Sequence, residues 1–453
     1  MTKPQIQTRP SAEKGMALLL ALFLTFLAGL LLTPVLERAV FHHNNAYRET
    51  RYLAALHLAE AGVDEGIWHL SFDKQKVWQG WNTSNDEVYL KHNGVFFDAD
   101  RNQLGEYEVR IDHPIPLGTE ISVGPIGSAL PFPITTNSTP TITAVAGVPD
   151  LNSIGSEIRV IQVLARARTV FSLGLFSDAD LELGGTTVVN SYDSRNGFYN
   201  SATNSSNNGD SGSNGDILLN GTPLIDGDAS AGGNVVLVGQ NAEITGQVEG
   251  GVTQIDLPLV SDLVAAAKLN NNNAEIPKAV KANGQLVNAF NPATNALSVQ
   301  AGATLTLPGG TKDNPKIYYL SDAQLAGNSN LIVQDYVILF TDGDLDFTGG
   351  TVINNGGNGP PEKFTVYSSG GLDTTVGLNG GAGFAGAVYA PGANLTITGG
   401  GNFFGAAVGG KVTLGGNGEF HYDEALGETG IIAFFEVNEW VEKTPPLPGA
   451  GAS

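Results

Sequence analysis

Two segments of the chain carry acidic residues at alternate positions, a spacing that can serve cation binding. The two sets are Asp178, Asp180 and Glu182, and Asp342, Asp344 and Asp346. Hard cations such as Ca²⁺ take carboxylate oxygens as ligands, so the second set is a weak calcium candidate. Alternate residues of a strand share one face, however, and the acids alternate with Leu181 and Leu345. A solvated strand face is therefore the favoured interpretation, and no cofactor is expected.

A second group of ionisable residues lies near the C-terminus, where His421, Tyr422 and Asp423 are consecutive. Glycoside hydrolysis needs paired carboxylates at one cleft, and spare Asp residues are plentiful. Abundance on an acidic surface is weak support for catalysis, and no basic residue accompanies the acids as a lyase base. We expect this cluster to be packed in a terminal coil, and we expect no enzyme. A polysaccharide-active β-helix enzyme is the less favoured alternative.

Composition limits the classes of function. The chain has 453 residues, 59 of them Gly, a net charge of −22 and no Cys. Only nine Lys and Arg follow Thr169. Nucleic acid is therefore excluded as a partner, because phosphate binding needs clustered cations. Abundant Gly and Asn suit short strands joined by tight turns, so the fold is expected to be mainly β.

The N-terminal segment predicts a membrane anchor. Residues 15–36 carry no charge, and a helix of this length rises roughly 33 Å, enough to cross a bilayer core of about 30 Å. Lys3, Arg9 and Lys14 precede it, which places the N-terminus in the cytoplasm. A cleaved signal peptide is the first alternative, but the apolar run is longer than usual and lacks a small-residue cleavage site. Pro34 is expected to kink the helix.

Beyond the membrane the helix is expected to continue over residues 37–72 as an amphipathic segment. Tyr47, Ala54, Ala61 and Trp68 are seven apart, which predicts that they lie on one apolar face. We therefore expect the first seventy residues to form one long helix whose N-terminal half lies in lipid.

This N-terminal region resembles the type IV pilin-like proteins, and within them the PilX type of minor pilin. The residues that carry the resemblance are the basic leader 1–15 ending in Gly15, the start Met16-Ala17-Leu18, the apolar helix 16–36 and the segment Leu58-Ala59-Glu60-Ala61-Gly62. The resemblance implies cleavage by prepilin peptidase after Gly15 and methylation of the new amino terminus at Met16. A plain membrane anchor is the alternative.

The resemblance also implies which residues anchor the chain and where it departs from the family. The anchoring residues would be Ala17, Leu18, Leu19, Leu20, Phe23, Phe26, Leu30 and Pro34. Major pilins carry Glu as the fifth residue of the mature chain, and here that position is Leu20. This departure favours a minor or tip role and puts integration into a filament in doubt.

The rest of the chain is expected to contain two β-rich parts. Residues 73–170 are interpreted as a β-rich connecting domain. Residues 171–430 repeat a short pattern: the segment from Phe176 aligns with the segment from Phe340, and Gly-bounded apolar runs recur about 18–20 residues apart. Recurring short strands closed by Gly predict a right-handed β-solenoid-like body in which each coil covers the next. A β-sandwich is the alternative.

Three further segments complete the domain organisation. Residues 261–269 have helical spacing and predict one short helix. Residues 200–216 are polar and predict a mobile loop. Residues 431–453 are expected to form a strand that covers one end of the solenoid, followed by a disordered tail. The region from Ala390 through Leu426 resembles a poorly characterised Gly-rich domain often joined to PilX-type N-termini, and it implies no activity.

Taken with the resemblance, the sequence predicts a structural, non-enzymatic subunit of a type IV pilus or related secretion filament. The expected partners are prepilin peptidase, other pilin or pseudopilin subunits and the membrane, with a surface ligand or carbohydrate as a further possibility. The expected location is the bacterial inner membrane, crossed once, with the body periplasmic or extracellular. A membrane-anchored surface adhesin or scaffold is the alternative.

Overall fold

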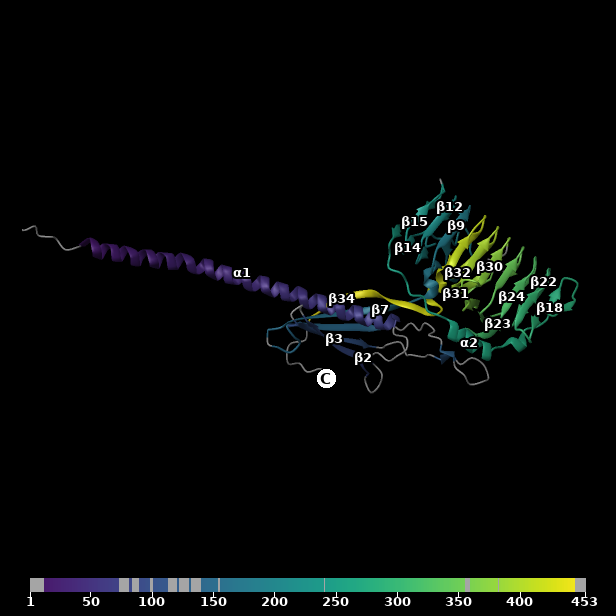
Figure 1. Cartoon of the computed structure of the whole chain (residues 1–453), viewed down its shortest axis with the longest axis horizontal. Helices are drawn as coiled ribbons and strands as arrows, with labels where there is room; N and C mark the ends of the chain where they lie inside the picture. Colours follow the sequence, from purple (N-terminus) through teal and green to yellow (C-terminus); the bar gives the residue numbers. More distant parts are fainter. Residues whose placement is uncertain are drawn as a thin grey trace, which may run out of the picture.

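The structure is a computed structural model, mainly β, with one long helix (Figure 1). It describes residues 12–72, 81–83, 89–97, 101–112, 120–121, 130–131, 140–153, 155–239, 241–354, 359–381 and 383–444. The predicted leader and C-terminal tail lie outside the described residues, except for residues 12–15 and 431–444.

Helix α1 (Ala12–Phe72) is continuous over its 61 residues. The predicted kink at Pro34 is wrong, because the helix passes through this residue and Figure 1 shows one gently curved rod. Pro34 removes a single N–H donor, and the turns on either side keep theirs. The Thr33 hydroxyl donates to the Gly29 carbonyl at 2.7 Å, so this side chain is satisfied within the helix.

The C-terminal half of α1 packs on an antiparallel sheet, here called the first sheet, whose strand order is β1-β2-β3-β6-β7-β34. Its strands are β1 (Asn82–Thr83), β2 (Tyr89–Phe97), β3 (Gln103–Asp112), β6 (Thr141–Val148), β7 (Glu157–Thr169) and β34 (Ile432–Lys443). A separate pair, β4 (Glu120–Ile121) and β5 (Leu130–Pro131), is also antiparallel.

The face of α1 that contacts the first sheet differs from the predicted one. Tyr47 and Trp68 are exposed, whereas Ala55, Ala59 and Val63 are buried against the sheet. The seven-residue spacing from Tyr47 to Trp68 therefore identified the wrong stripe of the helix. The helix instead presents its small residues, which let its backbone lie close to the strands.

Two glycines show how close that approach is. A Cβ on Gly62 would lie 3.1 Å from Cδ2 of Tyr107 and 3.2 Å from Cβ of Ala144. A Cβ on Gly66 would lie 3.1 Å from Cγ2 of Ile142. Both glycines therefore lie where a larger residue would push the helix away from β3 and β6.

The C-terminal strand does not cover the solenoid, which corrects the prediction. β34 pairs antiparallel with β7, with Phe435 opposite Ala167 and Trp440 opposite Val163. The Ser71 hydroxyl accepts the Phe435 N–H at 2.9 Å, which ties the end of α1 to this strand. The C-terminal end of α1 and the last strand of the described chain thus meet at the first sheet.

Residues 170–431 form the body, in which short strands stack in parallel. The first group is β8 (Leu175–Ser177), β9 (Leu181–Gly185), β10 (Val188–Tyr192), β11 (Ser211–Ser213), β12 (Ile217–Gly221), β13 (Leu224–Ile225), β14 (Ala229–Ala231), β15 (Val235–Leu237), β16 (Glu243–Ile244) and β17 (Val248–Gly250). The second group is β18 (Ala279–Lys281), β19 (Leu286–Val287), β20 (Phe290–Asn291), β21 (Ala296–Val299), β22 (Ala303–Leu307), β23 (Lys316–Leu320), β24 (Asp322–Leu325), β25 (Asn330–Val333), β26 (Val337–Thr341), β27 (Leu345–Thr348), β28 (Val352–Ile353), β29 (Phe364–Ser368), β30 (Thr375–Asn379), β31 (Gly383–Thr398), β32 (Asn402–Leu414) and β33 (Glu419–Asp423).

The body is solenoid-like because successive coils pair in parallel, apart from the antiparallel pairs that β18 makes with β19 and β22 and β20 makes with β21. The two aligned segments of the sequence occupy equivalent places: β8 and β9 both pair with β32, while β26 and β27 pair with β29 and β30. The coil length varies more than predicted, since Ser211 pairs with Ala229 but Leu345 pairs with Val376. The handedness of the coil stays a prediction.

The chain enters the body in its middle. From β8–β10 it coils outward to β15–β17, then crosses through helix α2 (Ser261–Leu269) and coils back from the other end. The returning β32 and β33 close the stack on β8–β10, with Phe420 beside Val189. Helix α2 matches the predicted bounds. Inside the stack, Phe384, Phe403 and Phe420 have ring centroids 4.7 and 5.0 Å apart.

The segment 200–216, predicted to be a mobile loop, holds defined structure. It includes β11, and the Asn204 side-chain amide donates to the carbonyls of Asp193 and Gly197 at 3.0 and 2.9 Å. The polar residues that were interpreted as a loop signal instead form hydrogen bonds with the backbone groups of a turn.

Candidate functional site

Among the described residues, the N-terminal half of α1 forms a long exposed apolar surface. Every described side chain from Leu19 through Thr50 is exposed, and Leu20, Phe23, Phe26 and Leu30 are 60–68% exposed. Figure 1 shows this half extending away from the rest of the chain. By length and composition, α1 could cross a membrane between Leu19 and Ser71. This surface is the candidate site, and it fits lipid or other apolar helices.

The processing residues lie at the start of this helix. Gly15 and Met16 have helical backbone, as do Ala17 and Leu18, but the side chains of these residues are outside the described ones. Their assigned role stays a prediction. Leu19, Leu20, Phe23, Phe26, Leu30 and Pro34 all project from the exposed half.

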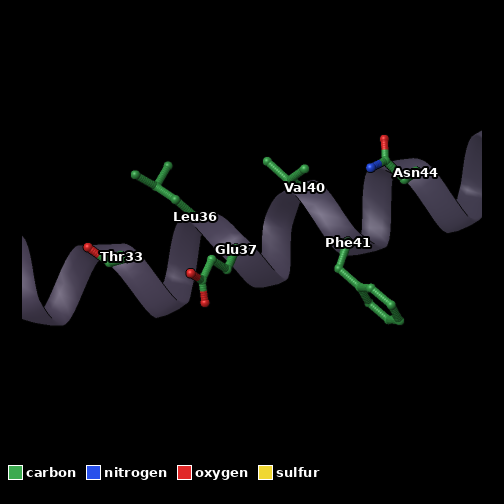
Figure 2. A pocket seen from close by; sticks show the side chains of 6 residues that line it. All are labelled: Thr33, Leu36, Glu37, Val40, Phe41 and Asn44. Carbon is green, nitrogen blue, oxygen red and sulfur yellow. The ribbon is translucent and has the colours of Figure 1, made fainter.

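A polar break follows the apolar run. Figure 2 shows Thr33, Leu36, Glu37, Val40, Phe41 and Asn44 fanning out from one stretch of α1. In the described part of the chain no second element faces them, so they bound no enclosed cavity. Glu37 is the first acid after the uncharged run, and it marks where the apolar surface gives way to a mixed one.

Polar contacts fix the angle at which the exposed half leaves the first sheet. Arg48 Nε lies 3.2 Å from Glu157 Oε1, and the Arg51 guanidinium donates to the Gly155 carbonyl at 3.3 Å. The Arg159 guanidinium lies 3.8 Å from the ring centroid of Tyr52. These contacts lie between the exposed and packed halves of α1, so they hold the start of the exposed half in a fixed position on the first sheet.

The predicted calcium ligands are not brought together. Asp342 accepts from the Tyr319 hydroxyl at 2.6 Å and pairs with Lys268 at 3.0 Å. Asp344 accepts from the Thr375 N–H of the next coil at 2.8 Å, while Asp346 lies within β27. Among the described residues, no three His, Asp or Glu form a group that could hold a metal ion. These carboxylates pin turns and α2 to the stack.

The first acidic set behaves in the same way. Asp180 accepts from the Asp216 N–H at 3.0 Å, and Asp216 in turn bonds the Asn234 N–H at 2.7 Å. Glu182 pairs with Lys411 at 2.8 Å. Asp180 and Asp216 thus each satisfy a backbone N–H of the following coil, whereas Asp178 accepts from the Asn214 side-chain amide at 2.8 Å. The alternate spacing alone did not reveal these roles.

His421 is buried in the outer layer of one body face. Its Nδ1 lies 2.6 Å from Asn190 Oδ1, and its ring stacks between Tyr199 at 3.8 Å and Phe404 at 4.8 Å. Burial lowers the pKa of His421 to about 3, so the ring is neutral at physiological pH. Burial likewise raises the pKa of Asp423. This cluster packs beneath residues 193–208 and opens to no described cleft.

Comparison with known proteins matches part of the chain to a family of unknown function and does not assign a function. Residues 240–429 match the family described as Domain of unknown function (DUF7305), less than half of the chain. None of the curated proteins matches. The solved structures to which the chain is similar include the competence-associated pilin ComZ from Thermus thermophilus and an ice-binding protein of Shewanella frigidimarina.

Both likenesses are remote. ComZ is 13% identical, with a TM-score of 0.31 over 86% of this chain and 97% of that chain. The ice-binding protein is 13% identical, with a TM-score of 0.26 over 57% of this chain and 98% of that chain. Scores of this size establish neither a shared fold nor a shared function.

Proposed function

We propose that the chain is a pilin-like structural subunit, a minor pilin or pseudopilin-like component of a type IV pilus or related secretion filament. The observation that carries the proposal is the division of α1 into an exposed apolar half and a half packed on the first sheet. The subunit would be held in the bacterial inner membrane by its apolar half until assembly. Its body would face the periplasm or the exterior, and it would have no catalytic role.

Burial of the exposed half of α1 is strongly favoured in free energy. From Leu19 to Leu36 its large apolar side chains are 42–70% exposed. Burying one Leu or Phe side chain contributes about 1.5–3 kcal/mol, so covering this segment is worth on the order of 10 kcal/mol or more. Lipid provides that cover before assembly, and the helices of neighbouring subunits provide it in a filament through close packing.

Processing belongs to the same proposal. Prepilin peptidase would cleave after Gly15, and Met16 would become the methylated amino terminus. Leu20 replaces the Glu that major pilins carry at the fifth mature position, so this subunit would join at a tip or in small numbers. A membrane-anchored adhesin or scaffold would use the same helix without entering a filament.

Shearing of surface filaments tests the proposal. The wild-type protein is expected in the sheared filament fraction, and a Gly15→Leu variant is expected to stay in the membrane fraction. Gly29→Leu is the matched control, because Gly29 lies in the same helix and a Cβ there meets nothing within 4 Å. A wild-type protein found only in membranes would contradict the filament role and favour the adhesin or scaffold.

A further inference from the structure

The two ends of the body differ in how their strand edges are covered. At the end near α2, β20 pairs with β21 and β18 pairs with β22. The third strand there, β23, is covered by side-chain amides: Asn272 and Asn273 accept from the N–H groups of Ile317 and Tyr319, each at 3.0 Å. Side-chain amides therefore cover β23 at this end, while in the part of the chain that the structure describes β19 and β20 each pair on one side only, with β18 and β21.

The opposite end is open. Among the described residues β15, β16 and β17 each pair on one side only, with β12, β13 and β14. Figure 1 places β14 and β15 at the tip of the body farthest from β18 and β22. An unpaired strand edge presents a row of backbone donors and acceptors that can template another strand.

The columns of inward-facing side chains, stacked in register on successive coils, end at exposed residues here. Leu414, Leu183, Leu219 and Leu237 lie in register on successive coils; the first three are buried, whereas Leu237 is 49% exposed. In the neighbouring column, Ala229 is buried and the residue stacked on it, Val248, is 51% exposed. One further strand layer would bury these inward-facing side chains as it buries their counterparts.

The charge of this end selects its occupant. The sequence has no Lys or Arg between Arg195 and Lys268. The acids in that interval are Asp210, Asp216, Asp226, Asp228, Glu243, Glu249, Asp256 and Asp262. Glu243 and Glu249 lie on the open coil itself and are exposed. A second copy meeting this one through the same surface would bring these like charges together.

We propose that the open end formed by β15, β16 and β17 is a docking surface for a β-strand of another protein that carries Lys or Arg beside an apolar stretch. Main-chain hydrogen bonds supply the pairing, the exposed Leu237 and Val248 supply the apolar contact, and Glu243 and Glu249 select the basic partner. This surface is separate from α1, so the inference goes beyond the filament proposal.

A strand peptide tests the surface on the full-length protein in detergent micelles. The probe is the labelled peptide KKTVTVTVKK, and its binding is measured by fluorescence anisotropy at low and high salt. The comparison peptides are EETVTVTVEE and the Lys-ended peptide with alternate backbone amides N-methylated. The Lys-ended peptide is expected to bind at least about tenfold more tightly than either, with the advantage over the Glu-ended peptide shrinking at high salt.

Charge reversal gives the decisive comparison. The double variant Glu243→Lys with Glu249→Lys is expected to invert the preference, binding EETVTVTVEE about tenfold more tightly than the Lys-ended peptide. Val280→Lys with Leu286→Lys is the control, because these apolar residues are also exposed but lie at the other end of the body, in β18 and β19. Unchanged far-UV circular dichroism verifies that each variant is folded.

Three results would overturn the inference. One is equal binding of the normal and N-methylated peptides, which removes strand pairing. Another is an unchanged peptide preference in the Glu243→Lys, Glu249→Lys variant. The third is a dimer by light scattering that Leu237→Lys dissociates, which would make a second copy the occupant.

Discussion

Leu219 and Leu237 are neighbours in one column of the body, and they differ in what covers them. Leu219 lies in β12 between Leu183 and Leu237 and is fully buried, whereas about half of Leu237 is exposed. Leu219→Ala is expected to lower the free energy of unfolding of the body by about 2–5 kcal/mol, because it leaves a cavity. Leu237→Ala is expected to lower it by about 1 kcal/mol or less, because much of that side chain already meets water.

The assay is urea unfolding of the full-length protein followed by far-UV circular dichroism. Tryptophan fluorescence would report on the wrong part, since Trp68, Trp78, Trp81 and Trp440 all lie outside residues 171–430. An unchanged slope with denaturant would show that the midpoints report stability. Equal losses for the two variants, or a larger loss for Leu237→Ala, would refute the stacking order and the open end.

Three further outcomes are expected. Gly405→Ala should destabilise the body strongly, because Gly405 has φ +139° and its Cβ would strike the backbone of Gly386 in the preceding coil. Gly400→Ala, where a Cβ meets nothing within 4 Å, should have little effect in the same urea assay. His421→Gln should flatten the pH dependence of the free energy of unfolding between about pH 6.5 and 3. In that range the unfolded chain binds a proton at His421 but the folded protein does not, so wild-type stability falls as the pH falls. An unchanged slope in the variant would refute this. Leu30→Lys should shift protein from the membrane to the soluble fraction, because a Lys at the centre of a spanning helix costs about 2.5–3.5 kcal/mol on insertion. Asn44→Lys, outside the apolar run, should not. Equal membrane fractions for the two variants would contradict a spanning segment.

Local patterns predicted the elements whose cause is local. Residues 261–269 form α2 as expected, since its helical spacing is contained in one short segment. The repeated segments from Phe176 and Phe340 occupy equivalent coil positions because the same alternation of inward and outward residues recurs in both. The uncharged run that predicted an anchor forms the exposed half of α1.

Long-range pairing was the part that sequence patterns could not supply. No local signal shows that β10 pairs with β33, more than two hundred residues away, or that the chain enters its own body in the middle. β34 reads as an apolar strand in either location, and only tertiary pairing with β7 decides between them. The packing face of α1 was predicted wrongly because it is formed by small residues such as Gly62 and Ala59. These are buried because the helix backbone lies close to the sheet, not because their side chains are large.

The acidic sets show the same limit at the candidate site. Alternate Asp residues fit a calcium site, a solvated face or turn pins equally well from spacing alone. The distinction came from the partners, such as the Thr375 N–H that Asp344 bonds across coils. A turn signal preceding each apolar run, as at Asp180 and Asp344, was the one cue in the sequence that pointed to this role.

The most direct test of the account is the intact mass and N-terminal sequence of the protein isolated from membranes, with and without prepilin peptidase. The account predicts a chain that begins at methylated Met16 when the peptidase is present and at Met1 when it is absent. A chain that begins at Met1 in both samples would contradict the pilin-like role and leave an anchored β protein.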